Sequence, residues 1–436
     1  MKIKTIICNL VLCLLCIIKA NAQDVLTLEN AVKIALENNF EIKISRNELK
    51  IDQVNVAYGN AGMLPRVAAN FQDNNNIQNT TQTRIDGTTN KLNNAKNNLL
   101  TYGVGLNWTI FDGFRMFARY DQLKTLQKLG EAELKLTIIT RISDVHSNYY
   151  DLVQQQQQLI ALDSSIVISN QRLELAKNRY NIGRASKLEV LNAQVDLNTD
   201  TTTLLRQKEL YANTKTLLNQ ILARDVSIDF RVIEQFSVDK SLQLSALQTL
   251  TSKQNPVLAA QILNKQVAEL QLKQIKGDRY PILRVNSAYN FSESEASLGF
   301  ITQASARGLN YGLSATLNLF DGFAQNRNEK IAKTQIENAT LAISQQNLAL
   351  STLLTTSFQT YLTNMELTAL EEKNEIIAKQ NLDITLEKFR IGTITTLEFR
   401  TAQLNYINAK VRNSNAQFQS KISEINLKEV AGNLSF

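Results

Sequence analysis

Tyr102-Gly-Val-Gly-Leu-Asn-Trp-Thr-Ile-Phe-Asp-Gly-Phe114 and Tyr311-Gly-Leu-Ser-Ala-Thr-Leu-Asn-Leu-Phe-Asp-Gly-Phe323 are two versions of one segment, separated by 209 residues (311 − 102). The same offset relates Arg179-Tyr-Asn-Ile-Gly183 to Lys388-Phe-Arg-Ile-Gly392. This period is far longer than the roughly 20–50 residues of a solenoid repeat. The sequence therefore indicates that one complex unit is present twice.

The duplication divides the chain into four parts. We expect a signal peptide at 1–22, a first repeat at 23–223, an equatorial linker at 224–253 and a second repeat at 254–436. Each repeat is expected to contain a helix, two strands, a long helix, a tip turn and a return helix.

The first residues have the pattern of a secretory signal peptide. Lys2 and Lys4 precede the apolar run Ile6–Ile18, and Ala20-Asn-Ala22 offers a cleavage site. The run is shorter than the ~20 residues that a membrane-spanning helix needs. All three cysteines lie in this segment, and the leucines before Cys16 argue against lipid attachment there.

Composition excludes several classes of function. One His and no cysteine after the signal peptide leave little for zinc, haem or Ser-His-Asp chemistry. We find no phosphate-binding loop or nucleophile elbow, so we expect neither an enzyme nor a cofactor. Removing the three signal lysines lowers the formal charge from +7 to +4, and no basic run suggests a nucleic-acid partner.

Apolar residues alternate with small or polar ones before each Phe-Asp-Gly, which is the period of a β-strand. One face of the first segment holds Tyr102, Val104, Leu106, Trp108 and Ile110. One face of the second holds Tyr311, Leu313, Ala315, Leu317 and Leu319. Their length of about 9–10 residues suits a transmembrane strand, although a soluble antiparallel sheet gives the same alternation.

Three further features favour the membrane. They are the signal peptide, the aromatic residues and an Asn/Thr-rich stretch at Gln72–Asn98, which we expect to be a long outer loop. Tyr102, Trp108 and Tyr311 are candidate lipid-interface anchors.

The alternating segments after Pro65 and Pro281 bring the expected number of strands to four per chain. Four strands cannot close a barrel, and open edges in lipid would leave backbone groups unpaired. Two chains would give eight strands, whose interior is filled by side chains, and three would give twelve, with room for a passage.

Each repeat also predicts a very long helix. Asp112 and Asp321 are N-cap residue types, and the 66 residues 114–179 contain no Pro and would span roughly 100 Å. Return helices are expected at 187–222 and 396–431, and shorter helices before the strands at 28–63 and 256–277, with the second long helix at 323–389. These lengths suggest a long helical tube.

The ordered set of motifs, present twice, resembles the TolC-like outer-membrane efflux protein family. The shared features are the two Phe-Asp-Gly junctions, Pro65 and Pro281 at strand starts, and the segments that follow Arg179 and Lys388. The resemblance covers essentially the whole mature chain. It implies an α+β membrane protein with internal duplication. It also implies that three chains would form a homotrimer, with a 12-stranded barrel in outer-membrane lipid and a trimeric α-barrel of long antiparallel helices extending through the periplasm.

The resemblance also implies partners and site residues. A periplasmic adaptor (membrane fusion) protein would dock on the tip and connect it to an inner-membrane pump or ABC exporter. The implied docking residues are Tyr180, Ile182, Gly183, Arg184, Ile391, Gly392 and Thr393.

The implied pore or gate residues are Glu398, Glu189, Thr401 and Phe389. Glu398 would form a ring of three carboxylates in a trimer, which favours cations. This chain departs from the family where Thr401 replaces an Asp. Phe389 stands where a hydrogen-bonding Tyr closes the pore elsewhere, and its phenyl ring cannot make that bond.

We therefore expect an exit duct in the outer membrane of a Gram-negative bacterium, serving a tripartite efflux pump or type I secretion. An alternative is a periplasmic coiled-coil adaptor or structural protein without a barrel. That alternative explains the helices but leaves the four alternating segments without a role.

Overall fold

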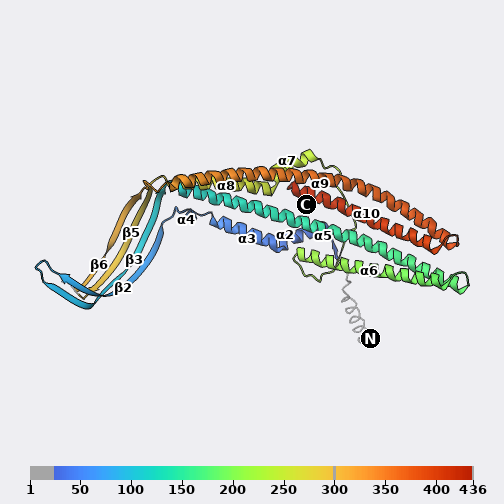
Figure 1. Cartoon of the computed structure of the whole chain (residues 1–436), viewed down its shortest axis with the longest axis horizontal. Coiled ribbons are helices and arrows are strands. Elements are labelled where there is room, and N and C mark those ends of the chain that lie inside the picture. Colours follow the sequence, from blue (N-terminus) through green and yellow to red (C-terminus); the bar gives the residue numbers. More distant parts are fainter. Residues whose placement is uncertain (1–23, 298–300, 435–436) are drawn as a thin grey trace, which may run out of the picture. The chain divides into compact units, whose positions relative to one another are not determined.

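A computed structural model describes residues 24–297 and 301–434 (Figure 1). The expected signal peptide at 1–22 lies outside this range. The described chain divides into two compact units, and each unit contains parts of both repeats. One comprises residues 24–45, 134–256 and 347–434, and the other comprises 46–133 and 257–346.

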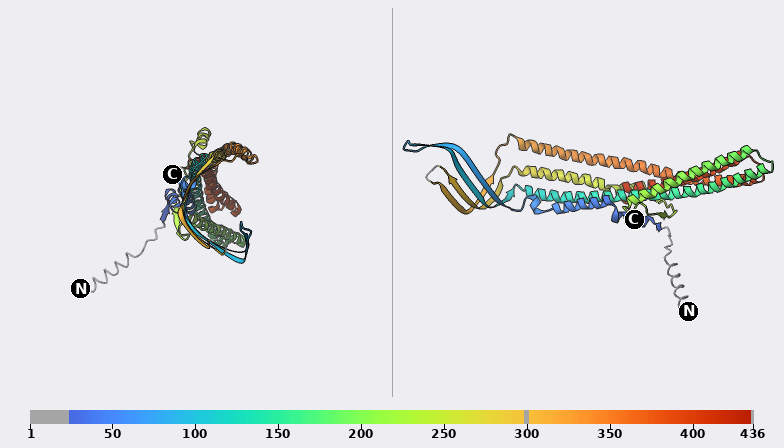
Figure 2. Two further views of the ribbon diagram at one scale, coloured as in Figure 1. Left: turned by 90° about the vertical axis from the view of Figure 1, so that its left-hand side faces the viewer. Right: turned by 90° about the horizontal axis from the view of Figure 1, so that it is seen from below.

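The second unit contains an antiparallel sheet in the order β2-β3-β5-β6, visible in Figures 1 and 2. The strands are β2 (Arg66–Thr83), β3 (Thr89–Asp112), β5 (Ile282–Ala296) and β6 (Gln303–Thr316). The segments that alternate in sequence are thus strands, except that β6 ends at Thr316 and leaves Leu317 and Leu319 outside it, and the strands of the two repeats meet where β3 pairs with β5. Within the described residues, β2 and β6 each pair along one side.

The expectation of a long loop at Gln72–Asn98 is wrong. Strand β2 continues to Thr83, β3 begins at Thr89, and a short turn joins them. Strand pairing satisfies the backbone of this polar stretch, and Thr suits an extended chain. A bulge interrupts the pairing, where Asn94 adopts a φ of 58° and its amide donates to Asn79 Oδ1 over 2.9 Å.

A Phe-Asp-Gly motif precedes each long helix, at the end of β3 in the first repeat and four residues after the end of β6 in the second. Asp112 Oδ1 accepts the Met116 amide at 3.1 Å, and Asp321 Oδ2 accepts the Gln325 amide at 2.7 Å, so each carboxylate binds a first-turn amide although the helices begin three residues later. The two residues after each Asp are left-handed, with φ of 73° and 68° in the first repeat and 66° and 64° in the second. A phenylalanine rarely adopts this conformation, so the same strained turn recurs in both repeats.

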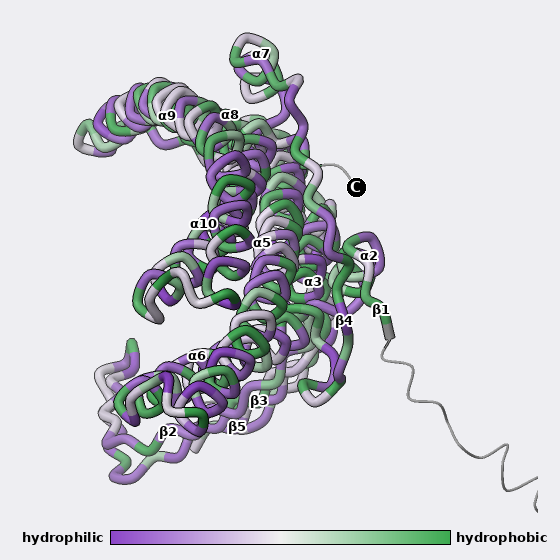
Figure 3. The backbone as a smooth tube through the Cα atoms, turned by 90° about the vertical axis from the view of Figure 1, so that its right-hand side faces the viewer, coloured by the Kyte–Doolittle hydropathy of each residue, from purple (hydrophilic) through white to green (hydrophobic). Residues whose placement is uncertain are grey.

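The long helices follow the expected pattern closely. Their bounds are α5 (Arg115–Asn181), α6 (Lys187–Ile221), α8 (Pro256–Gly277), α9 (Ala324–Arg390) and α10 (Thr396–Val430). In Figure 3, hydrophobic and hydrophilic residues alternate along these helices. Among the described residues, no helix has a stretch that is both apolar enough and long enough to cross a bilayer.

The helix expected at 28–63 is instead three helices, α2 (Leu28–Asn38), α3 (Phe40–Asn55) and α4 (Tyr58–Ala61). Asn39 causes the first break, because its Oδ1 accepts the amides of Glu41 and Ile42 at the start of α3. Its Nδ2 also donates to the carbonyl of Ile221 at 2.8 Å. Side-chain bonds to the backbone thus replace continued helix at this position.

The main core of the first unit surrounds a small parallel sheet. Strands β1 (Asp24–Leu26) and β4 (Phe230–Val232) pair there, and Phe230 is fully buried. Tyr149 Oη donates to the Leu26 carbonyl at 3.0 Å and accepts the Ile233 amide at 3.1 Å. The segment between the repeats, which also contains α7 (Leu244–Gln254), is thus tied to α5.

Gly113 and Gly322 provide a matched test of the junction. An Ala at either position must adopt a left-handed φ, at a cost of about 1 kcal/mol. At Gly113 alone, the added Cβ would lie 2.1 Å from the Gly277 carbonyl oxygen, whereas at Gly322 nothing lies within 4 Å. We expect Gly113→Ala to cost about 1–3 kcal/mol more than Gly322→Ala, seen as a lower melting temperature by circular dichroism. Equal melting temperatures would contradict this close approach.

Candidate functional site

The turn that joins each long helix to its return helix is built around a glycine. Gly183 has a φ of 75° and Gly392 a φ of 80°. The Gly183 amide donates to the Tyr180 carbonyl at 2.9 Å, and the next amide, of Arg184, donates to the Arg179 carbonyl at 2.8 Å. The second repeat makes the same pair of bonds, and this helix-ending motif requires a left-handed residue.

The sequence-predicted docking residues lie on these two turns, and most are exposed. Ile182 and Ile391 are 66% and 75% exposed, which is high for isoleucine. Tyr180, Arg184 and Thr393 are exposed as well. The turns thus present apolar side chains beside polar backbone at the end of each helical hairpin.

Arg179 and Glu189 connect the two turns to each other. Arg179 Nη2 donates to the Phe389 carbonyl at 2.7 Å, and its guanidinium lies 4.8 Å from the Phe389 ring centre. Glu189 Oε1 accepts from the Thr396 hydroxyl at 2.9 Å and lies 3.7 Å from Arg179 Nη1. These contacts hold the first-repeat turn against the second.

Phe389 is buried rather than exposed at a surface. Its ring stacks on Phe399 with centres 4.9 Å apart, and both rings are 1% exposed. The link to Arg179 uses the backbone carbonyl, so it does not need the hydroxyl that a phenylalanine lacks.

Glu398 and Thr401 are both exposed near the start of α10. Glu398 Oε2 accepts the Thr395 amide at 2.9 Å, while Thr395 Oγ1 accepts the Glu398 amide at 3.3 Å, forming a capping box. The Thr401 hydroxyl donates to the carbonyl of Leu397. Glu398 therefore has a local structural role whatever its carboxylate faces in an assembly.

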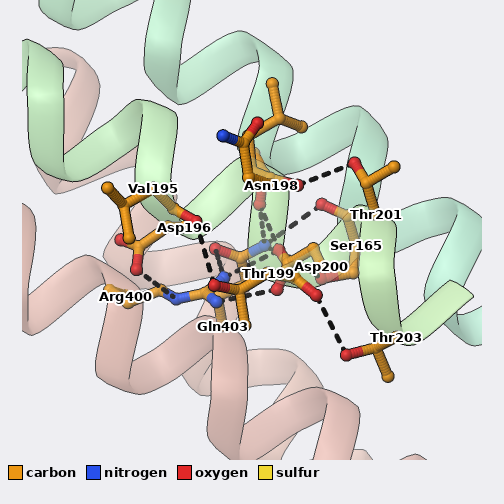
Figure 4. Close-up of polar contacts among 12 residues, drawn as sticks. Ser165, Val195, Asp196, Asn198, Thr199, Asp200, Thr201, Thr203, Arg400 and Gln403 are labelled. Carbon is orange, nitrogen blue, oxygen red and sulfur yellow. Dashed lines mark hydrogen bonds and ion pairs between the residues drawn. The ribbon is translucent and has the colours of Figure 1, made fainter.

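A buried ion pair between the repeats is the strongest polar feature of this region (Figure 4). Arg400 in α10 donates to both carboxylate oxygens of Asp200 in α6, at 2.8 and 2.7 Å. Their side chains are 11% and 9% exposed. Ser165 and Ser169 of α5 also donate to Asp200, so three helices meet at one carboxylate.

Hydrogen bonds keep Asp200 ionised. Burial alone would raise the pKa of this carboxyl, but the bonds from Arg400 and Ser169 outweigh it and lower the pKa below the usual 3.8. The stability that the pair contributes is therefore present above pH 3.8 and is lost as the pH falls through the lowered pKa.

Sequence reasoning missed this pair. Asp200 and Arg400 occupy non-equivalent positions in the two repeats and lie 200 residues apart. Each also stands on a helix whose faces are not clearly segregated into polar and apolar (Figure 3). A single sequence offers no signal that couples two such residues.

The predicted interface anchors lie on the sheet. Tyr102 stacks on Phe291 of β5, with ring centres 4.9 Å apart. Trp108 is partly exposed, and its Nε1 donates to the Met63 carbonyl at 2.9 Å. Tyr311 on β6 is 83% exposed.

Comparison with known proteins identifies the family. Residues 31–224 and 247–433 match the family described as "Outer membrane efflux protein". This chain belongs to the outer membrane efflux protein family. The match spans both repeats, which confirms the resemblance deduced from the two sets of motifs.

Individual relatives have low sequence identity to this chain, but each match extends over most of both proteins. The outer membrane protein TolC of Escherichia coli is 21% identical, and the match covers 79% of this chain and 71% of TolC. The proteases secretion protein PrtF of Dickeya chrysanthemi is 18% identical, and the match covers 100% of this chain and 93% of PrtF. The Campylobacter jejuni CmeC outer membrane channel shares the fold with a TM-score of 0.76. Its sequence is 16% identical, and the match covers 93% of this chain and 85% of CmeC.

The family assigns the place and the kind of activity. The protein is an exit channel for efflux or type I secretion in the outer membrane of a Gram-negative bacterium, as the sequence predicted. The family is one of transport proteins, and the roles of the turns and contacts described above in a channel stay predictions.

Arg400→Met tests the buried pair. The substitution leaves Asp200 charged and unpaired, so we expect a cost of about 3–5 kcal/mol and a clearly lower melting temperature. Arg412→Met is the control, because Arg412 meets Glu371 at 3.1 Å with half of its side chain exposed and should cost at most about 1 kcal/mol. Adding Asp200→Leu to Arg400→Met removes the unpaired charge as well, so the double variant should recover most of the stability lost in Arg400→Met. Equal effects of the two arginine variants would refute the role given to the pair.

Proposed function

We propose that three copies of this chain assemble into one exit duct, serving either an efflux pump or type I secretion. Their sheets would close a 12-stranded barrel in the outer membrane, and their helices would form a tunnel through the periplasm. The observation that carries the proposal is the four-stranded sheet with open edges at β2 and β6.

Open edges are costly in a membrane. Each unpaired N–H or C=O group in hydrocarbon costs several kcal/mol, so a spanning sheet must close on itself or on another copy. Four strands are too few to close alone. A chain of an outer-membrane family with this sheet therefore needs neighbours.

The number three follows from the interior of the barrel. Eight strands leave an interior filled with side chains, whereas twelve leave room for a passage. The face of β3 and β6 opposite the apolar set carries small and polar residues that suit a water-filled lumen, namely Gly103, Gly105, Asn107, Gly312, Ser314 and Thr316.

The helices carry unpartnered apolar side chains that neighbouring copies would cover. Exposed examples on α6 are Leu188, Leu191, Val195, Leu205, Leu210 and Leu217. Exposed examples on α9 are Leu341, Leu348, Leu353, Leu362, Leu370 and Ile377. Such faces on long helices are typical of coiled-coil packing between subunits.

The exposed tip turns supply the contact with partners. A periplasmic adaptor would receive the turns around Gly183 and Gly392, and through it an inner-membrane pump or ABC exporter would supply the energy.

The name of PrtF, a proteases secretion protein, supports a polypeptide as one class of cargo. Glu398, in a ring of three, would favour cations at the inner end of the duct.

The alternative, a coiled-coil adaptor without a barrel, gains no support. Strands β2, β3, β5 and β6 form a continuous paired sheet, and the family is one of outer-membrane proteins.

One preparation tests both the number of chains and the carboxylate ring. We expect native mass spectrometry of the detergent-extracted protein to give three chains per particle. In planar bilayers, Glu398→Gln should lower the permeability ratio of cations to anions about two-fold or more, since it removes charge but keeps the shape. A monomer or dimer would refute the trimeric duct, and unchanged selectivity would remove Glu398 from the pore.

Docking at the turns is tested at their two left-handed glycines. A Cβ at Gly183 would have nothing within 4 Å, and one at Gly392 would lie 3.5 Å from Arg179 Nη2. Gly183→Trp and Gly392→Trp should reduce export in cells about ten-fold while trimers persist, because a bulky ring blocks the partner. Gly87→Trp, in the β2–β3 turn, is the control, since Gly87 also has a positive φ and nothing within 4 Å. Normal export by both tip variants would exclude docking there.

A further inference from the structure

A cavity of about 210 Å³ lies between α5 and the hairpin of α9 and α10. Its lining comes from all three helices and includes Ile168, Arg172, Leu175, Leu386, Phe389 and Phe399. These residues belong to one compact unit, so the cavity is a feature of that unit alone. Its size suits a ligand of on the order of ten non-hydrogen atoms.

The walls of the cavity are apolar and well ordered by packing. Phe389 and Phe399 form a nearly parallel stacked pair, with an interplanar angle of 10°. Leu382 is buried with this pair, and Ile168, Leu175 and Leu386 pack against the cluster. A flat or branched apolar group would therefore contact aromatic and aliphatic side chains on several sides.

Arg172 adds a buried positive charge to this lining. None of its side chain is exposed, and its one charged partner is Asp196, which Nη2 contacts. Its Nε and Nη1 atoms are buried and have no hydrogen-bond partner. Each buried N–H group without an acceptor costs about 1–3 kcal/mol, so a native structure normally gives it one.

Arg400 shows how this region satisfies a guanidinium. It makes two hydrogen bonds to the two oxygens of Asp200 and a third to Gln403. Arg172 lacks an equivalent second acceptor, although it borders a cavity where one would fit. Arg390 also lines this cavity, so the rim carries positive charge as well, partly balanced by Glu387 at 2.8 Å.

We propose that this cavity binds a small carboxylate that has an aromatic or branched apolar body. The carboxylate would accept from the free N–H groups of Arg172 after a small rotation of that side chain, in the planar geometry that guanidinium and carboxylate share. The apolar body would lie against Phe389, Phe399 and Leu386.

Such a ligand joins the two repeats. It contacts α5 on one side and the α9–α10 hairpin on the other, beside the link between Arg179 and the Phe389 carbonyl. Binding therefore favours the arrangement in which these helices are together and raises the melting temperature. The inference does not depend on adaptor docking or on the identity of the cargo.

The test uses the full-length protein in detergent, titrated with phenylacetate by isothermal calorimetry. Phenylacetamide is the neutral compound of the same shape. We expect saturable binding of phenylacetate at one site per chain and at least ten-fold weaker binding of phenylacetamide. Arg172→Met should weaken phenylacetate binding at least ten-fold, and Arg412→Met, which removes an exposed arginine elsewhere, should leave it unchanged.

Leu175→Phe keeps Arg172 and fills the cavity, so it should also weaken binding at least ten-fold. This variant decides the question if Arg172→Met fails to fold. Equal affinity for acid and amide, absence of saturable binding, or retained affinity in the filled variant would each overturn the proposal.

Discussion

The architecture proposed for this protein depends on the need to pair every backbone N–H and C=O group in a membrane. Within the described residues its sheet has four strands, of which β2 and β6 pair along one side only, and the chain belongs to a family of outer-membrane proteins. Lipid offers no hydrogen bonds, so in the proposed duct these edges would pair with strands of other copies. The two long helices begin shortly after strands of this sheet, at Arg115 after β3 and at Ala324 after β6, with a Phe-Asp-Gly motif at each transition.

Local patterns predicted much of the fold. The absence of proline allowed α5 and α9 to be placed within about two residues, and alternation located the strands. The caps at Asp112 and Asp321 and the glycine turns at the tips were likewise readable, because each depends on a few adjacent residues. Predictions failed where a side chain competed with the backbone, as at Asn39, or where strand pairing extended into polar sequence beyond Gln72.

The polar contacts between the repeats were not predictable in this way. Arg400 and Asp200 meet across 200 residues, and the contact of Arg179 uses the backbone carbonyl of Phe389, which any residue would provide. Phe389 was expected at the gate from family resemblance, yet its ring is buried beside Phe399. From sequence alone, phenylalanine at this position indicates that the hydrogen bond of a tyrosine hydroxyl is absent. In the structure, the backbone carbonyl of Phe389 accepts a hydrogen bond from Arg179.

The position of the Asp200–Arg400 pair has a consequence for symmetry. The equivalent residues at the 209-residue offset are Ala409 and Leu191, which cannot form an ion pair. In a closed ring of three chains, six junctions between repeats would therefore alternate in chemistry, charged inside each chain and apolar across each boundary. In the proposed trimer, the junctions inside each chain would therefore be held by a buried ion pair that the junctions between chains lack.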